Sequence, residues 1–226
     1  MIKLPKFTTQ SMYDSETDFN LQMNKERISK FLIHYEIFKK ITNVKGDIVE
    51  CGIFKGTSFV RLALFRELFK KNCNLIGFDI FGDIYPETSF ENEKKHRKHW
   101  VKTAGHSSIS LAQMEKVFKK KKIKNYKLFK GDVLKTIPNF VKKNKKIKIS
   151  LLNIDLAFVE PTECALNYLY SHVSKGGAII FDNYGGTGKD GTFYEGETRV
   201  IKKFLKKKGK KIKFFKYFVR PSYIIK

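Results

Sequence analysis

The stretch GDIVECGIFKGTS, from Gly46 to Ser58, is the segment that decides the fold. Its first half is a short apolar run that breaks at glycine, a pattern typical of a buried strand. Glycines permit a tight turn, and Thr57 and Ser58 are residue types that cap the start of a helix. The stretch therefore predicts a strand, a turn and a helix, which together form the first unit of an α/β protein.

Strands and helices are predicted to alternate through most of the remaining chain. This alternation indicates right-handed crossovers and a mostly parallel sheet covered by helices on both faces. The last two of the seven predicted strands are too close in sequence for a crossover, so the C-terminal strand should be antiparallel. The predicted strands are 46–52, 73–82, 126–132, 148–155, 178–182, 212–219 and 222–226, and the predicted helices are 24–41, 57–70, 111–121, 135–144, 161–177 and 197–208.

Length and composition indicate one globular domain over residues 1–226, with an N-terminal helical cap in residues 1–45. Hydrophobic residues make up 42% of the chain, which is enough for a substantial core. The apolar runs are too short to cross a bilayer, and the opening residues MIKLPKFTTQ lack the apolar centre of a signal peptide. We therefore expect a cytoplasmic protein without membrane insertion.

The net charge of +24, from 46 Lys and Arg against 22 Asp and Glu, limits the kinds of partner. Such a charge suits nucleic acid, an anionic surface or an anionic small substrate. The excess is nearly all lysine, whereas arginine is favoured for bidentate phosphate contacts. The lysine runs at 119–124, 142–148 and 202–213 are dispersed along the chain. We favour solvated faces and helix ends as their explanation over a dedicated nucleic-acid patch.

An acidic residue is predicted at the carboxyl end of each strand in the parallel set. These ends form the edge of an open α/β sheet at which ligands bind. Acids do not gather at one edge for stability, because like charges repel and desolvation is costly. The pattern therefore predicts a functional site at this edge. The acids are Glu50, Asp79, Asp132, Asp155 and Asp182, and Asn183 follows the last of them.

The spacing E-x-G-x-x-x-G-x-S begins at Glu50 and matches neither a phosphate-binding P-loop nor the dinucleotide fingerprint G-x-G-x-x-G. Its glycines let the backbone approach a ligand at a helix start, and Asp79 is placed to bind both hydroxyls of a ribose. A pocket lined by acids suits a cationic adenosine compound without phosphates, such as S-adenosylmethionine. The predicted cofactor-binding residues are Glu50, Cys51, Gly52, Gly56, Thr57, Ser58, Asp79, Gly131, Asp132 and Asp155.

Five stretches in register resemble the macrocin O-methyltransferase family. The resemblance implies a Rossmann-like class I methyltransferase that uses S-adenosylmethionine to methylate a sugar hydroxyl of a small molecule, sugar nucleotide or glycan precursor. The positive charge would help to attract an anionic carrier of that sugar. The stretches are GDIVECGIFKGTS, LIGFDIFGD, GHSSISLAQMEKVF, KGDVLKTIP and LLNIDLAFVEPTECALNYLYSHVSKGGAIIFDNYG. The resemblance as a whole extends in order from about residue 20 to about residue 190.

The same positions resemble catechol O-methyltransferase, in which an Asp and a later Asp-Asn pair bind a metal ion. This resemblance implies that Asp155, Asp182 and Asn183 bind Mg²⁺, to which hard oxygen ligands are suited. The metal would lower the pKa of an acceptor hydroxyl and orient its oxygen. Taken separately, Asp155 could cap a helix and the Asp-Asn pair could be an ordinary turn. Their occurrence together favours the metal site.

Two departures from these families concern the general base. Ala157 stands where the macrocin pattern has a second acid, and Phe158 stands where the catechol enzyme has a lysine base. The long polar segment 83–109 is predicted to form a lid, and it contains three histidines. Asp155 and His106 are therefore the candidate catalytic residues.

Two other functions remain open alongside the small-molecule O-methyltransferase. One is a nucleic-acid methyltransferase on the same fold, which is disfavoured because the lysine runs largely lack interleaved aromatic residues. The other is a cofactor-binding homologue that is impaired in catalysis by the absence of an acid at Ala157. A homo-oligomer is also compatible with the sequence.

Overall fold

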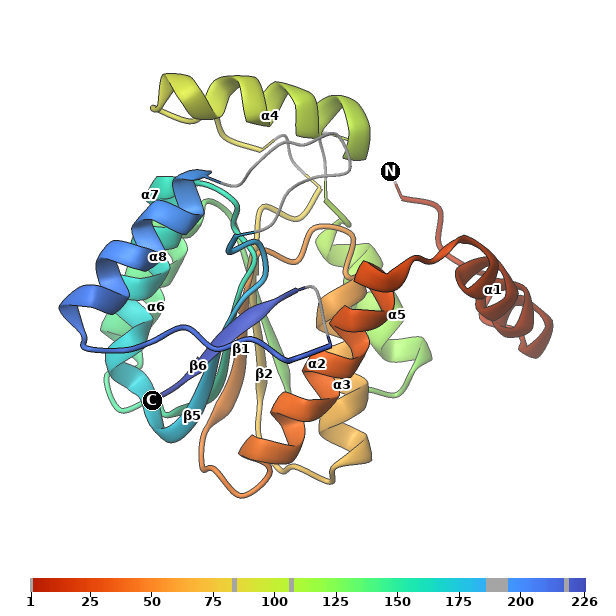
Figure 1. The fold of residues 1–226 in the computed structure, drawn as a ribbon. Helices are drawn as coiled ribbons and strands as arrows, with labels where there is room; N and C mark the ends of the chain where they lie inside the picture. Colours follow the sequence, from red (N-terminus) through yellow and green to blue (C-terminus); the bar gives the residue numbers. More distant parts are fainter. Residues whose placement is uncertain (1, 83–84, 106–107, 186–194, 218–219) are drawn as a thin grey trace.

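The computed structural model describes residues 2–82, 85–105, 108–185, 195–217 and 220–226. Within these residues the chain forms a six-stranded sheet in the order β3-β2-β1-β4-β5-β6 (Figure 1). Neighbouring strands run parallel except for β5 and β6, which are antiparallel. The strands are β1 Asp47–Cys51, β2 Leu75–Asp79, β3 Tyr126–Lys130, β4 Ile149–Ile154, β5 Val173–Phe181 and β6 Ser222–Ile225.

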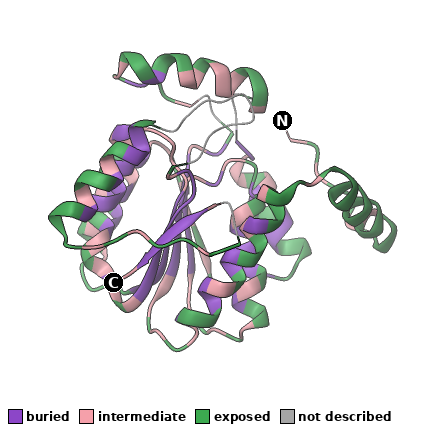
Figure 2. Cartoon of the chain, in the orientation of Figure 1, coloured by how far each residue is buried: buried purple, intermediate pink, exposed green. Residues whose placement is uncertain are grey.

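Helices cover both faces of the sheet, because successive strand residues point into two different cores. Ile48 of β1 packs in one core with α2, α3 and α5, whereas Val49 packs in the other with α6, α7 and α8. Figure 2 shows the buried strands between these two layers. The predicted α/β architecture, mostly parallel with an antiparallel C-terminal strand, is thus confirmed. The helices are α2 Lys25–Ile41, α3 Thr57–Leu68, α5 Leu111–Lys120, α6 Val133–Lys143, α7 Val159–Leu169 and α8 Glu195–Lys207.

The prediction of seven strands was wrong, since the described sheet has six. The predicted strand 212–219, of which residues 218 and 219 lie outside the described part, contributes only a one-residue bridge between Lys213 and Tyr223. Tyr217 in the same segment is 82% exposed. A strand pairs through several successive residues of its neighbour. Strand β6 has four residues and pairs with this segment at one residue, so the segment does not form a strand.

The helix predicted over 161–177 is also shorter than expected. Helix α7 ends at Leu169, the 3₁₀ turn η1 covers Tyr170–His172, and β5 follows directly. Gly176, which was predicted to end the helix, lies in β5 with a φ of 79°. Its N–H donates to the carbonyl oxygen of Lys226 at 2.9 Å, so this glycine serves the sheet and not a helix terminus.

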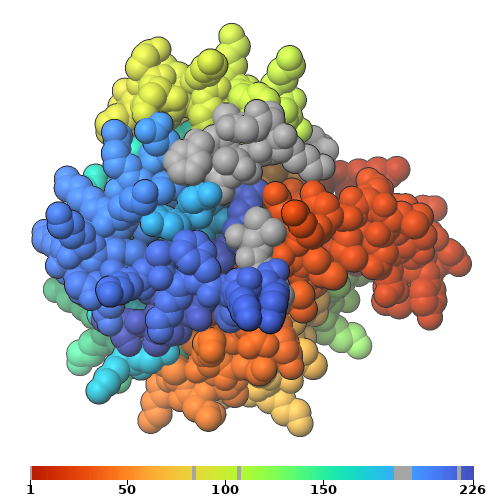
Figure 3. All heavy atoms as spheres, in the orientation of Figure 1, coloured from red at the N-terminus to blue at the C-terminus, as the bar shows by residue number. Residues whose placement is uncertain are grey.

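Two helices, α1 Thr9–Gln22 and α4 Glu91–Ala104, were not predicted. Helix α4 lies over the carboxyl ends of the strands, at the top of Figure 1, and belongs to the predicted lid 83–109. Helix α1 belongs to the predicted cap 1–45, but it projects from the body and buries none of its residues (Figures 1 and 3). Among the described helices, none combines the length and apolar character that crossing a membrane requires.

Candidate active site

The turn after β1 brings the ends of β1 and β4 into close contact. Gly52 has a φ of 89°, and a Cβ added to it would lie 2.0 Å from the backbone oxygen of Asp155. The N–H of Asp155 donates to the carbonyl oxygen of Cys51 at 2.9 Å. Only glycine fits this approach, so the first glycine of the sequence motif is explained by the packing of two strand ends.

Asp79, at the end of β2, stabilises the same turn through hydrogen bonds to its backbone. Its Oδ2 accepts the N–H groups of Ile53 at 2.8 Å and Phe54 at 3.0 Å, and its Oδ1 accepts the N–H of Phe81 at 2.9 Å. The Asp79 side chain is 2% exposed. A carboxylate has about four acceptor positions, and the Tyr85 hydroxyl lies at the fourth, 3.3 Å from Oδ2 and 3.5 Å from Oδ1.

A cavity of about 300 Å³ opens beside these turns, at the carboxyl edge of the sheet. Aromatic side chains cover it, since the Trp100 ring lies 5.0 Å from the Phe54 ring and 5.1 Å from the Tyr85 ring. Its size is at the lower end of the range for small-molecule sites. Six of the predicted site residues line the cavity, namely Gly52, Asp79, Gly131, Asp132, Asp155 and Asn183.

Other predicted site residues lie away from the cavity wall. Cys51 is fully buried in the core formed with α6, α7 and α8. Gly56 adopts the left-handed conformation before α3 and is packed next to Met114, and Thr57 is exposed. The structure therefore brings three of the strand-end acids, Asp79, Asp132 and Asp155, together at one cavity but places these three other residues away from its wall.

Glu50 lies inside the sheet and not on the cavity wall. The Ser58 hydroxyl donates to its Oε1, while Oε2 has no hydrogen-bond partner within the described residues. Burial raises the pKa of Glu50 well above its usual range. The side chain of Asn153, which is paired with Glu50 in register on β4, likewise lacks a described partner. A polar layer with unused donors and acceptors thus lies under the site, facing α2 and α3.

Asn183 joins two carboxyl groups, those of the half-buried Asp155 and the buried Glu197. Its Nδ2 donates to Asp155 Oδ1 at 2.9 Å and to Glu197 Oε2 at 3.3 Å, and Glu197 Oε2 also accepts the N–H of Ala157 at 2.9 Å. Burial, and then the neighbouring Asp182, raises the pKa of Asp155 to about 6. Burial, and then Asp155, raises the pKa of Glu197 to about 8. The two neighbouring acids therefore keep their protons to a higher pH than ordinary carboxyl groups do.

Asp182 differs from these acids because Lys30 of α2 neutralises it. The Lys30 ammonium donates to Asp182 Oδ2, and the two side chains are 15% and 2% exposed. Burial alone would raise the pKa of Asp182, but the charge and hydrogen bond of Lys30 hold it below its usual value. The N-terminal helix thus supplies a cation to the end of β5.

The predicted metal ligands are neighbours at the ends of β4 and β5, and they are engaged in other contacts. Asn183 turns its Nδ2 to Asp155, and Asp182 is paired with Lys30. No three His, Cys, Asp or Glu side chains in the described part of the chain are placed to hold a metal ion. The donor set still fits Mg²⁺ chemically, since it offers two carboxylates and an amide oxygen. The raised pKa of Asp155 also marks an excess of negative charge that a cation would relieve.

Comparison of the sequence with known protein families identifies the family of this chain. The sequence model described as Macrocin-O-methyltransferase (TylF) matches residues 22–208. The chain belongs to the macrocin O-methyltransferase family. It is accordingly an S-adenosylmethionine-dependent methyltransferase that transfers the methyl group to oxygen. The resemblance seen in the five sequence stretches is therefore confirmed.

Solved methyltransferases share the fold of this family member. CalS11, a TDP-rhamnose 3′-O-methyltransferase of calicheamicin biosynthesis, is 20% identical, with a TM-score of 0.65 over 97% of this chain and 87% of that chain. The O-methyltransferase NovP is 18% identical, with a TM-score of 0.71 over 88% of this chain and 79% of that chain. Comparison with curated protein sequences gave no significant match.

Sequence reasoning missed two residues of this macrocin-family site, Lys30 and Glu197. Glu197 stands at the start of the predicted helix 197–208, where an acid is ordinarily explained by the helix dipole. Lys30 is one basic residue among many on α2. In neither case does the local pattern reveal a buried partner, because each contact joins segments that are distant along the chain.

The described part of the predicted lid is docked on the site. Glu93 of α4 is buried, and its carboxylate accepts the N–H of Val159 at 2.9 Å and the hydroxyl of Thr88 at 2.8 Å. Arg97 donates to the carbonyl oxygen of Tyr85 at 2.6 Å. His106, the candidate catalytic histidine, lies outside the described residues.

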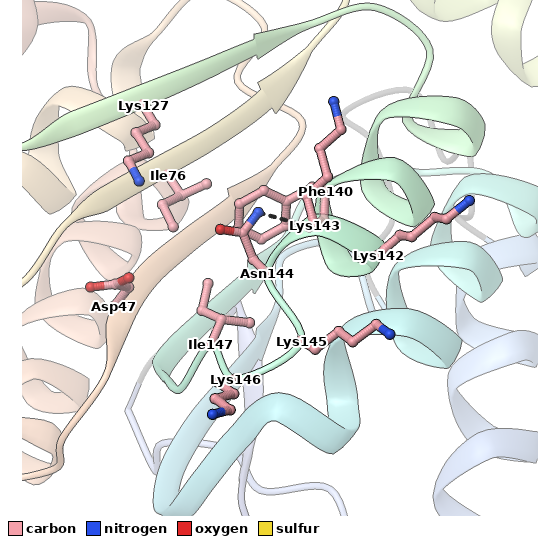
Figure 4. Close-up of a pocket in the computed structure, with 10 residues that line it drawn as sticks. All are labelled: Asp47, Ile76, Lys127, Phe140, Lys142, Lys143, Asn144, Lys145, Lys146 and Ile147. Atoms are coloured by element: carbon pink, nitrogen blue, oxygen red, sulfur yellow. Dashed lines mark hydrogen bonds between the residues drawn. The ribbon is translucent and has the colours of Figure 1, made fainter.

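A second, more open hollow of about 480 Å³ lies at the opposite end of the sheet. Figure 4 shows its lining, which combines Asp47 and Ile76 near the start of their strands with Lys127 and the end of α6. The lysine side chains there point in different directions and do not converge on a common point (Figure 4). This hollow is therefore best explained as a solvated basic surface, in line with the sequence interpretation of the lysine runs.

Proposed function

We propose that this chain transfers a methyl group from S-adenosylmethionine to a hydroxyl of a sugar-containing small molecule. The observation that carries the proposal is the cavity wall, which joins the Gly52 turn, Asp79 and Asp132 to Asp155 and Asn183. Membership of the macrocin family supports methyl transfer to oxygen. Similarity to CalS11, itself a TDP-rhamnose 3′-O-methyltransferase, supports a sugar as the acceptor.

The cofactor would lie along the cavity between the β1 turn and the start of α6. The backbone at Gly52 has no side chain and permits close approach of the cofactor. A ribose hydroxyl would replace the Tyr85 hydroxyl at the fourth acceptor position of Asp79. Asp132 caps α6 by accepting the N–H of Leu134 at its Oδ1, at 2.9 Å. Its other oxygen is then left for a donor on the adenine. Tyr85 and Trp100 would cover the bound adenosine from above.

We assign Asp155, Asp182 and Asn183 as the residues that would hold Mg²⁺. When bound, the metal would lower the pKa of the acceptor hydroxyl and fix the orientation of its oxygen. Asp155 and Asn183 border the cavity, so these ligands would place the acceptor beside the methyl donor. Asp182 would first have to exchange its ion pair with Lys30, so Lys30 and the metal compete for one carboxylate.

The acceptor would enter on the side of Asp182 that faces α2. The positive charges of Lys30 and Arg220 act on Asp182 from this side. The polar layer under the site, with unused atoms on Glu50, Asn153 and Arg61, also faces α2 and α3. Cations near a polar layer suit a sugar that is carried on an anionic group such as a nucleoside diphosphate.

A methyl-transfer assay with labelled S-adenosylmethionine tests the proposal against its alternatives. The acceptors would be nucleoside diphosphate sugars, neutral glycosides and structured RNA. We expect transfer to a sugar class, and we expect Asp155→Asn to lose transfer while calorimetry still detects S-adenosylhomocysteine binding. Transfer to RNA alone would contradict the sugar assignment. Tight cofactor binding without transfer to any acceptor would instead favour a catalytically impaired homologue.

The same assay also tests whether methyl transfer needs Mg²⁺. EDTA should abolish turnover, and added Mg²⁺ should restore it, whereas cofactor binding should change little. Asp182→Asn should behave like EDTA treatment. Full turnover in EDTA would show that Asp182 and Asn183 do not bind a catalytic metal ion and are part of an ordinary turn.

A further inference from the structure

Helix α1 lacks the packing that stabilises helices in proteins. Its 14 residues include no buried residue, whereas every other described α-helix buries at least one. Isolated helices shorter than about 12–15 residues are marginal in water. The capping box at Thr8 helps the helix to begin but buries no apolar surface. Within the described chain, α1 is therefore a helix whose sides are open to contact with another surface.

The position of α1 is nevertheless fixed at both ends. Before it, Ile2 and Leu4 pack against the core, and the carbonyl oxygen of Ile2 accepts a hydrogen bond from Gln113 Nε2 at 2.6 Å. After it, the chain passes directly into α2, and the ring of Phe19 packs edge-on against Phe31 at 5.5 Å. Helix α1 is thus an anchored projection, as Figures 1 and 3 show, and not a loose tail.

Apolar side chains are exposed on both α1 and the outer face of α2. On α1, Leu21 is 81% exposed and Met12 is 57% exposed. The inner face of α2 packs in the core, yet its outer face carries a second apolar stripe at the spacing i, i+3, i+4 and i+7. We call this stripe the outer face of α2, and it consists of Ile28, Phe31, Leu32 and Tyr35.

The charges of the two helices are complementary. Helix α1 contains three acidic residues, Asp14, Glu16 and Asp18, and no lysine or arginine, although the whole chain carries +24. Helix α2 contains five basic and two acidic residues. At 1.5 Å per residue the helices are about 21 Å and about 25 Å long, so one can lie along the other.

We propose that α1 docks on the outer face of α2 in a second copy of this chain. Two-fold symmetry would form this contact twice, with each copy giving its acidic helix and receiving that of its partner. Such an arrangement covers the exposed apolar residues of both helices at once. It also pairs opposite charges across the interface.

A membrane surface fits these helices less well. An interfacial helix carries lysine or arginine on its polar face to meet anionic lipids, whereas α1 carries only acidic charges there. The proposed contact also lies behind the site, because the same α2 carries Lys30, which contacts Asp182. Association would therefore stabilise α2, the helix whose Lys30 neutralises Asp182 at the end of β5.

Sedimentation velocity on the full chain tests the proposal. At about 50 µM, in the range expected for a dimer with an interface of standard size, we expect a species of twice 26.4 kDa. The double variant Ile28→Lys/Leu32→Lys should sediment as a monomer. Tyr168→Lys, a matched change of an exposed apolar residue on α7, should remain a dimer. Circular dichroism would establish that each variant is folded.

Charge reversal gives a second test that a misfolded variant cannot imitate. The triple variant Asp14→Lys/Glu16→Lys/Asp18→Lys should dissociate, and so should Lys25→Glu/Arg27→Glu on α2. A chain that carries both sets should associate again, because the complementary charges have exchanged helices. The amides of α1 should exchange slowly in the dimer and at least tenfold faster in the dissociated variants.

Three results would overturn the proposal. They are a monomeric wild type across the concentration series, a triple variant that remains a dimer, and an equal loss of association in Tyr168→Lys. Sedimentation with anionic vesicles is the arm that tests a membrane. Co-sedimentation of the wild type, if it is lost in the α1 variants, would assign α1 to a lipid surface and likewise overturn the dimer.

Discussion

Replacing Lys30 by glutamine tests the electrostatic account of the site most directly. Lys30 and Asp182 are 15% and 2% exposed, so the variant leaves a buried carboxylate without its neighbouring cation. Removing one partner of a buried ion pair costs about 3–5 kcal/mol. The partial exposure of Lys30 favours the lower end, about 3 kcal/mol. In a chain of this length, 1 kcal/mol corresponds to about 2–4 °C, so Tm should fall by about 6–12 °C.

The effect should depend on pH in a defined direction. Lys30 holds the pKa of Asp182 below its usual value, so the pair contributes stability that is present above the unfolded pKa. This contribution is lost as pH falls through the folded pKa. In Lys30→Gln the pKa of Asp182 should rise, and the contribution should be missing at pH 7. The difference between variant and wild type should therefore shrink as pH falls below about 4.

Urea denaturation and thermal melting in EDTA measure the change, with Lys39→Gln as the control. Lys39 lies on the same helix and pairs with Glu36 at 3.1 Å, but this pair is largely exposed and should contribute about 0–1 kcal/mol. Adding Mg²⁺ should then raise the Tm of Lys30→Gln more than that of wild type, because Asp182 is no longer occupied. The reasoning fails if Lys30→Gln and Lys39→Gln are equally stable. Equal stabilisation of variant and wild type by Mg²⁺ would show that Lys30 does not compete with the metal.

Three further outcomes are expected. Asp79→Asn should weaken S-adenosylhomocysteine binding at least tenfold in calorimetry, since a hydrogen bond to a charged group contributes about 1.5–3 kcal/mol. Unchanged affinity would show that Asp79 does not bind the ribose. Gly52→Ala should lower the free energy of unfolding by more than the about 1–2 kcal/mol of a left-handed residue. Gly209→Ala, at a φ of 60° with no atom within 4 Å of the added Cβ, is the control for the backbone term alone. Wild type should lose stability as pH rises from 5 to 8, because the raised pKa of Glu197, about 8, makes its contribution to stability fully present below the unfolded pKa and lost as pH rises through the folded pKa. In EDTA, Glu197→Gln should show a smaller loss of stability over this range. An unchanged dependence of Tm on pH in the variant would contradict this.

The strand-end acids could be predicted from sequence because their positions depend on local rules. A short apolar run that stops at an acid marks a strand end, and parallel strands bring such ends to one edge. Asp79, Asp132 and Asp155 accordingly line one cavity. The same rules do not tell which way each acid faces, and Glu50 lies within the sheet although its sequence context resembles that of Asp79.

The unpredicted features depend on contacts between distant segments. Lys30 meets Asp182 across 152 positions, and no local signal distinguishes it from the other lysines. The predicted strand 212–219 fails for the same reason, since its alternating pattern is correct but the edge it would need is only four residues long. Helix α1 has no clear apolar face in its sequence pattern, and among the described residues it buries none and contacts the rest of the chain through Phe19, which packs against Phe31.

The two aspartates of the site show how one distant residue decides the charge of a strand end. Asp155 and Asp182 end adjacent parallel strands, the first half-buried and the second buried, yet the pKa of Asp155 is raised and that of Asp182 is lowered. The difference comes from α2, whose Lys30 reaches only Asp182 among the described contacts. A cation bound near Asp155 would lower this raised pKa. Because α2 also carries the apolar stripe proposed to meet a second copy, its two faces would connect the assembly of the protein with the charge of its active site.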